Sequence, residues 1–161
     1  MSEKFDADRH IRNVLGKRTV NLTDPAGIVL AGVEGVEGAA EKIDPDIEIG
    51  VDRLVMQPGS AFELHTHPGA HLLYVLRARG LIHVDGVDYE IGPGDTIFVP
   101  ARYAHGVRTR REAREPFELL AFGVPHMPLT SPERMTLVDE ALPAADSTPG
   151  GPTRMGGAAH V

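Results

Sequence analysis

The sequence predicts an all-β protein, and three features of its 161 residues support this prediction. Glycine (18 residues) and proline (13 residues) are frequent and divide the chain into short segments, as in β proteins with many turns. Within the segments, apolar residues alternate with polar ones or form short runs, which are the patterns of half-buried and buried strands. The pair Asp85-Gly86 separates two such segments and is typical of a two-residue hairpin. The length suits one domain with one core.

The turn signals delimit about nine expected strands. The first is an edge strand over residues 28–33, and the Gly-, Glu- and Asp-rich stretch after it is expected to be a loop. The other eight are expected over residues 47–56, 62–67, 72–76, 80–84, 87–91, 96–99, 105–109 and 117–124. Strand signals are therefore densest in the middle of the chain.

The two ends of the chain have a different character. Residues 7–15 are expected to form a short helix that ends near Gly16. A second short helix is expected near Ser131-Pro132-Glu133, because Ser is a good N-cap and Pro is favoured at the first helical position. Residues 146–161 are rich in Pro, Gly and Ala and lack a periodic apolar face, which predicts a tail.

Composition and charge exclude several classes of protein. The formal net charge is −7, and no broad basic face is present, so we expect no nucleic-acid partner. The absence of cysteine excludes disulfides, thiolate nucleophiles and Cys-ligated zinc. No apolar run approaches the roughly 18 residues of a membrane span, and the polar first residues show no secretory signal. We therefore expect a cytoplasmic protein with no membrane partner.

The histidines suggest a metal site. His65, His67 and His71 lie within seven residues, and the first two share a face of an expected strand. A turn at Pro68-Gly69 can bring His71 back beside them. Converging neutral imidazoles are ligands for Zn, Mn, Fe, Ni or Cu, so one divalent transition metal is the expected cofactor. The alternative is that these are ordinary core or surface histidines, and His10, His126 and His160 are interpreted in that way.

Two motifs resemble those of the cupin family. Gly59, followed after five residues by His65, then by His67 and His71, resembles the first cupin motif. The stretch from Gly94 through Pro100 to His105 resembles the second. The resemblance implies a double-stranded β-helix, or jelly-roll barrel, with a metal inside its mouth. It divides the chain into an N-terminal extension and edge strand (1–44), a cupin barrel (45–125), and a C-terminal short helix and tail (126–161).

The chain departs from the family pattern at several positions. His71 stands where most cupins have Glu, so the implied ligand set is His65, His67, His71 and His105, in which every ligand is a nitrogen. In the alternative, His71 fills the position without binding, which leaves three ligands. Ala78 and Arg102 replace glycines, and Thr109 replaces the usual Asn.

Strand alternation suggests which other side chains surround the metal. Glu63 precedes His65 by two residues, so we expect it inside as a general base, with an exposed rim position as the alternative. The other candidates for the substrate pocket are apolar or aromatic residues and one histidine: Leu73, Val75, His83, Phe98, Tyr103 and Val107. The arginines of 108–114 are interpreted as a solvated loop, and the alternative is that Arg102 and Arg108 steer an anionic substrate to the mouth.

These features predict a metal-dependent enzyme for a small organic substrate, aromatic or enolic, because the cavity walls are apolar. An oxidative, dioxygenase-like reaction is the preferred hypothesis. The first alternative is a non-redox zinc cyclase or isomerase, because small cupins that include polyketide cyclases resemble this layout. The second is a cupin that binds or senses a small ligand without turnover. A homodimer is also expected, because a second copy often covers the edge strands of small barrels.

Overall fold

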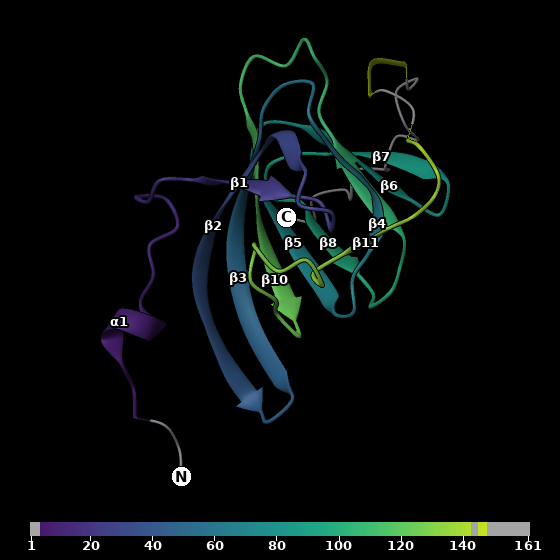
Figure 1. Ribbon diagram of the computed structural model, residues 1–161. Coiled ribbons are helices and arrows are strands. Elements are labelled where there is room, and N and C mark those ends of the chain that lie inside the picture. Colours follow the sequence, from purple (N-terminus) through teal and green to yellow (C-terminus); the bar gives the residue numbers. More distant parts are fainter. Residues whose placement is uncertain (1–3, 143–144, 148–161) are drawn as a thin grey trace, which may run out of the picture.

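The computed structural model describes residues 4–142 and 145–147, and it consists of two facing antiparallel sheets (Figure 1). In order, the six-stranded sheet contains β1 (Val20–Thr23), β2 (Val29–Asp44), β3 (Ile47–Met56), β10 (Phe117–Val124), β5 (Ala70–Arg77) and β8 (Thr96–Val99). The five-stranded sheet contains β11 (Thr136–Leu137), β4 (Ala61–Thr66), β9 (His105–Arg108), β6 (Gly80–Val84) and β7 (Val87–Ile91). The predicted all-β jelly-roll fold is confirmed.

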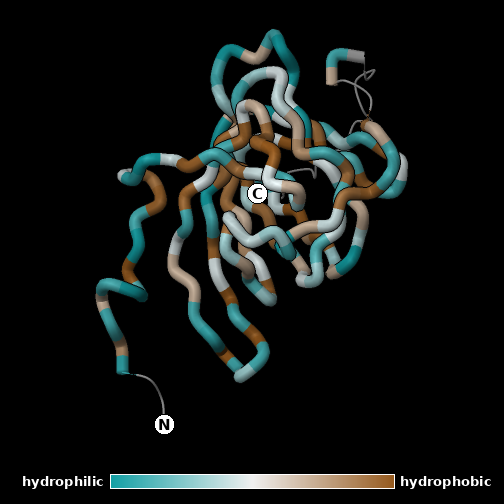
Figure 2. The backbone as a smooth tube through the Cα atoms, in the orientation of Figure 1, coloured by the Kyte–Doolittle hydropathy of each residue, from teal (hydrophilic) through white to brown (hydrophobic). Residues whose placement is uncertain are grey.

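The core lies between the two sheets, where hydrophobic segments concentrate in Figure 2. Strand β10 shows how the sequence produces it: alternate residues Phe117, Leu119 and Ala121 are buried, and the residues between them are half-buried on the outer face. A fully buried side chain of this kind stabilises the fold by about 2 kcal/mol. The same alternation brings Gly123 to the inner face, at the end where the sheets enclose a cavity.

The prediction of a short edge strand followed by a loop at residues 28–46 is wrong, because one long strand occupies most of this stretch. Strand β2 continues to Asp44 and lies inside its sheet, between β1 and β3. The glycines that indicated a loop are positions of close packing instead. A Cβ on Gly38 would lie 2.3 Å from the carbonyl oxygen of Val51, and one on Gly35 would lie 2.7 Å from a methyl carbon of Leu129. Composition alone does not distinguish these two uses of glycine.

The expected N-terminal helix is much shorter than predicted. Helix α1 spans only Ala7–His10. The Asp6 side chain caps its N-terminus, and the backbone becomes extended at Ile11, directly after the helix. Ile11 and Leu15 are both 68% exposed, so a longer helix would have no apolar surface to pack against.

The helix expected near Ser131 is absent from the described residues. The chain there forms turns and then strand β11, which pairs with β4. Backbone N–H groups of this segment form hydrogen bonds with other parts of the protein: Leu129 N–H donates to the Glu37 carboxylate, and Val138 N–H donates to the Leu64 carbonyl. These bonds replace the internal hydrogen bonds of a helix.

Residues 126–138, here called the closing segment, therefore run along the open end of the sandwich and line its cavity. A short 3-10 helix follows at Ala145–Ser147, and most of the predicted tail, from residue 148 onward, lies outside the described residues. Among the described helices, none is long and apolar enough to cross a membrane.

Candidate metal centre

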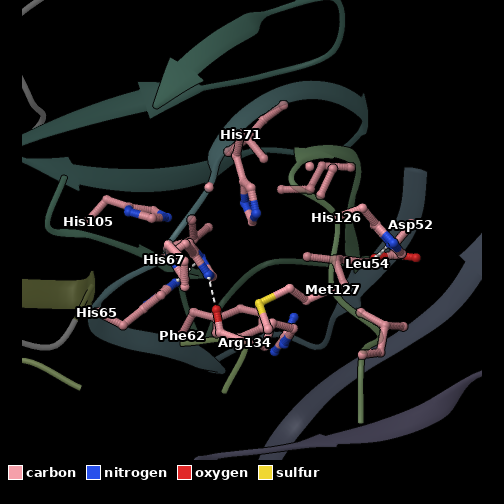
Figure 3. Close-up of a pocket in the computed structure, with 18 of the residues that line it drawn as sticks. Asp52, Leu54, Phe62, His65, His67, His71, His105, His126, Met127 and Arg134 are labelled. Atoms are coloured by element: carbon pink, nitrogen blue, oxygen red, sulfur yellow. Dashed lines mark hydrogen bonds and ion pairs between the residues drawn. The ribbon is translucent and has the colours of Figure 1, made fainter. Parts of the chain in front are cut away.

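Three of the predicted ligands meet in the structure. The ligand atoms of His65, His67 and His105 all lie within 4.8 Å of one another, and all three residues are buried. His65 is in β4 and His105 opens β9, and the antiparallel register of these strands sets the two residues directly opposite each other. His67 follows β4 by one residue and projects into the same space (Figure 3).

Each of these rings is oriented by a backbone carbonyl. Nδ1 of His65, His67 and His105 lies 2.5, 2.7 and 2.9 Å from the carbonyl oxygens of Glu63, Arg134 and Tyr103, respectively. A carbonyl only accepts, so each Nδ1 must donate, and a neutral ring then carries no proton on Nε2. The three Nε2 lone pairs are therefore available to a metal ion, which is the usual arrangement around metal-bound histidine.

The spacing of the Nε2 atoms fits an ion. Those of His65 and His67 lie 2.9 Å apart. They do not hydrogen-bond to each other, because both rings carry their proton on Nδ1, so the two lone pairs repel unless a cation lies beside them. Ligand atoms at right angles, each about 2.1 Å from an ion, would be about 3 Å apart. The donor set present therefore fits a divalent transition metal.

Burial keeps these imidazoles neutral. Loss of solvent lowers the pKa of His67 from 6.5 to about 4, and it also lowers the pKa values of His65 and His105. Neutral imidazole is the form that binds metals. At neutral pH no proton has to leave before an ion enters.

His71 lies beside the trio without joining it. Its ring centroid is 4.1 Å from that of His67 but 6.5 Å from that of His105, and its ring lines the cavity. Burial lowers the pKa of His71 to about 2, so it too is neutral. The structure thus brings together three histidines, and a four-histidine site stays a prediction.

The cavity and its open mouth together hold about 740 Å³ of empty space. Of the six predicted pocket residues, Leu73 and Val107 line it. Val75 is fully buried in the core instead. The remaining lining residues are Asp52, Leu54, Met56, Phe62, Pro68, Gly69, Leu119, Ala121, Gly123, Pro125, His126, Met127, Leu129 and Arg134, besides the four histidines.

The inward position predicted for Glu63 is wrong. Its side chain is exposed and does not line the cavity, and Phe62 is there in its place. The cause is an irregularity of the β4–β9 pairing between Phe62 and His65, which breaks the alternation from which the prediction was made. Only the carbonyl of Glu63 serves the site, as the partner of His65 Nδ1.

Three further pocket predictions do not hold, because the side chains lie outside the cavity. His83 pairs with Asp88 at 3.0 Å, Phe98 is 66% exposed, and the Tyr103 hydroxyl donates to Asp85. Steering by Arg108 does not fit the structure either, because this side chain is buried and paired with Asp88.

Sequence analysis missed a polar group at the other side of the cavity (Figure 3). His126 Nε2 lies 3.0 Å from Asp52 Oδ2, and His126 Nδ1 lies 3.0 Å from Glu48 Oε1. These carboxylates raise the pKa of His126 to about 9, so it carries a positive charge at neutral pH. Asp52 Oδ1 is buried and has no hydrogen-bond partner among the described residues.

Arg134 is the other missed residue. It is 7% exposed, its guanidinium carbon lies 5.6 Å from the centre of the Phe62 ring, and its Nη2 has no hydrogen-bond partner among the described residues. The sequence does carry one signal for Asp52: it is an acidic residue that alternates with Leu54 and Met56 along one strand, so it faces inward with them. His126 and Arg134 lie in irregular structure, where the alternation of strand residues gives no prediction.

The comparisons with known proteins agree with this geometry. Residues 52–123 match the family model described as a cupin domain. This segment is a cupin domain. It contains all four histidines of the predicted ligand set, and the cupin domain together with the closing segment encloses the cavity.

Similar proteins have several different names. The chain is 34% identical over 56 residues, 34% of its length, to an oxalate-binding protein from Thermotoga maritima. The chain spans about half the length of the curated relatives it matches, 58% and 46% of them. In structure it resembles the polyketide cyclase RemF from Streptomyces resistomycificus (TM-score 0.57, 18% identity, 80% and 82% of the two chains). It also resembles a cupin-2 domain protein from Rhodospirillum rubrum (TM-score 0.60, 17% identity, 80% and 79%). At such identities these likenesses show the fold.

Proposed function

We propose that this protein is a metal-dependent enzyme that moves protons on a small, largely apolar organic substrate, without net oxidation. One observation carries the proposal: the three-histidine cluster and the Asp52–His126 pair line the same cavity. This favours cyclase- or isomerase-like chemistry over the oxidative reaction preferred from the sequence.

The ligands of the ion would be His65, His67 and His105, and the variant His71→Gln tests whether His71, whose ring lies beside that of His67, is a fourth ligand. The candidates for the ion are Fe, Mn, Zn, Ni and Cu, which all bind imidazole. When bound, the metal supplies Lewis acidity, which polarises a substrate oxygen and acidifies the neighbouring C–H or O–H group.

Asp52 is the proposed base. Its Oδ2 accepts a hydrogen bond from His126 Nε2, while Oδ1 has no hydrogen-bond partner in the described part of the chain. Oδ1 can take a proton from a substrate C–H or O–H and return it to another atom of the same substrate. Such a transfer balances atoms and electrons without an oxidant or a second substrate.

His126 holds Asp52 in place and connects it toward solvent. Its Nδ1 donates to Glu48, whose side chain is 33% exposed, so a chain of hydrogen bonds leads from the protein surface to the cavity. The apolar walls, which include Leu54, Phe62 and Leu73, exclude water and strengthen the electrostatic interactions inside.

The proposal gains support from the likeness to RemF, whose name states a cyclase activity. To test it, the protein loaded with each candidate metal is incubated in D₂O with a panel of β-keto acids and phenolic ketones. Proton NMR then measures deuterium incorporation, and an oxygen electrode measures O₂ consumption. We expect deuterium at a substrate carbon, no O₂ uptake, and loss of exchange in Asp52→Asn.

The other two hypotheses give different results in the same experiment. Substrate-dependent O₂ consumption would establish the dioxygenase-like reaction in place of ours. Binding of panel members, seen as shifts of their NMR signals, with neither exchange nor O₂ uptake would identify a ligand-binding cupin without turnover.

The homodimer stays a proposal. Strand β8 is at the edge of the six-stranded sheet, and its Phe98 is opposite Leu72 of β5, with both side chains exposed on the outer face. A free edge beside exposed apolar side chains suits pairing with a second copy. Light scattering would give twice the chain mass for the wild type and a lower mass for Phe98→Glu. A wild-type mass equal to one chain would exclude the dimer.

A further inference from the structure

We propose that Arg134 is the specificity residue of the cavity, and that it restricts the substrate to small organic anions by binding a carboxylate or similarly charged oxygen. The inference rests on the proposed function, because it concerns the same cavity. It names the charge class of the substrate, which neither the metal ligands nor the proposed base determines.

Arg134 is a buried cation without an ion-pair partner among the described residues. Two other arginines of low exposure have carboxylate partners: half-buried Arg53 donates to Glu118 at 2.8 Å, and buried Arg108 pairs with Asp88. Arg134 is 7% exposed and has no carboxylate partner of this kind in the described structure, and its Nη2 has no hydrogen-bond partner there. Burying an unpaired charge is destabilising, so such a residue needs an explanation.

The side chain of Arg134 lies at the wall of the cavity. Arg134 lines the cavity, and its guanidinium lies over the face of Phe62, another lining residue. The Arg134 carbonyl accepts the Nδ1 proton of His67, and the Arg134 N–H donates to Ser131. The backbone that carries the guanidinium is therefore fixed to a metal ligand, and the free donor is held inside the cavity.

The charges around the cavity also favour an anion. Asp52 and Glu48 both contact His126, so the formal charges of these two carboxylates, His126 and Arg134 sum to zero. Arg134 forms no ion pair with either carboxylate in the described part of the chain, and a bound dication would give the site a net positive charge. An anionic ligand is the species that neutralises such a site.

The planar shape of the Arg134 guanidinium narrows the chemical class of the expected anion further. A guanidinium is planar and presents parallel N–H bonds that match the two oxygens of a carboxylate. The apolar residues around it, such as Leu54 and Leu129, suit a hydrocarbon or aromatic body. Together these features specify an aromatic or aliphatic carboxylate, or an enolate or phenolate of similar size.

The experiment compares benzoate with benzamide, which has nearly the same shape but no charge. Binding of each is measured by titration calorimetry, on the protein as purified and again after removal of metal with a chelator. Because a hydrogen bond to a charged group contributes more than a neutral one, we expect benzoate to bind at least about tenfold more tightly in both preparations.

Variants then assign the preference to one residue. Arg134→Met should abolish the preference, Arg134→Lys should retain part of it, and Arg114→Met, which removes an equal charge from an exposed loop, should leave it unchanged. Equal binding of the two probes to the wild type, or a preference that survives in Arg134→Met, would overturn the inference.

Failure of the role of Arg134 and failure of the proposed function give different results. The preference is measured after chelation as well, so a protein that holds no metal and catalyses nothing can still show it. Conversely, a protein that binds metal and exchanges protons but shows no preference for benzoate would contradict the role of Arg134 and leave the proposed function standing. Circular dichroism of Arg134→Lys and Arg134→Met checks that both variants fold.

Discussion

The metal-centre histidines and His126 line one cavity but have opposite chemical properties. His65, His67 and His105 each donate Nδ1–H to a backbone carbonyl, and burial keeps them neutral with Nε2 free. His126 has carboxylates at both ring nitrogens, which keep it protonated and leave no lone pair for a metal. A buried histidine beside a backbone carbonyl therefore stays a neutral ligand, whereas one whose ring nitrogens both face carboxylates becomes a cation.

The largest effect expected from this comparison is on stability. His126→Gln removes the cation that compensates buried Asp52, and breaking such a pair should lower the free energy of unfolding by about 3 kcal/mol. Urea denaturation measures this, and the variant should still bind metal. The matched control is His10→Gln, because the His10–Glu41 pair is more exposed and should contribute much less to the free energy of unfolding. Equal effects of the two substitutions would contradict our account of His126.

The pH dependence of stability should reveal both kinds of histidine. The pKa of His126 is raised from 6.5 to about 9, so its contribution is complete below pH 6.5 and is lost as pH rises toward 9. The pKa of His67 is lowered to about 4, so the folded metal-free protein is destabilised as pH falls from 6.5 toward 4. Urea midpoints across pH 4–10 should therefore show a maximum near 6.5. In His126→Gln the alkaline decline should flatten, and an unchanged decline would show that His126 is not its cause.

Sequence reasoning located one side of the cavity and not the other, for a physical reason. His65, His67 and His71 lie close together in sequence, and their spacing relative to glycine and proline is recognisable without a structure. The Asp52–His126 pair joins residues 74 positions apart, and it forms only because β3, β10 and the closing segment meet in the fold. No local pattern encodes such a contact.

The other errors arose where a local rule was broken. Alternation predicts an inward Glu63, but the irregularity between Phe62 and His65 turns it outward. Gly35 and Gly38 suggested a loop, although they allow strands and side chains to approach closely. In both cases tertiary packing determines what the residue does, and periodicity and composition do not record packing.

A smaller effect is expected at His71, which lies beside the trio but outside it. If three histidines make the centre, His71→Gln should weaken metal binding by only about tenfold, the lower end of the range for residues around a ligand set. Competition with a chromogenic chelator measures the affinity. A loss as large as that of His67→Ala would instead establish the four-histidine site predicted from the sequence.

The smallest expected effect is on stability, at Ala78, a residue outside the cavity that departs from the cupin motif. Ala78 stands at a glycine position of the motif and has a φ of 60°, a left-handed conformation that is unfavourable for any residue with a Cβ. Ala78→Gly should therefore stabilise the protein by about 1 kcal/mol without changing metal affinity. Ala113→Gly, at a residue without positive φ, is the matched control and should not stabilise it. Thermal unfolding decides between stabilisation and no effect.

The most direct test of the central claim is the metal content of protein purified without a histidine tag. After equilibration with each candidate ion and dialysis, elemental analysis should find one ion per chain in the wild type and in His126→Gln. His67→Ala should bind the ion more than about 100-fold more weakly and lose it on dialysis. If His67→Ala holds as much metal as the wild type, the three imidazoles are not a metal centre and the proposed function fails.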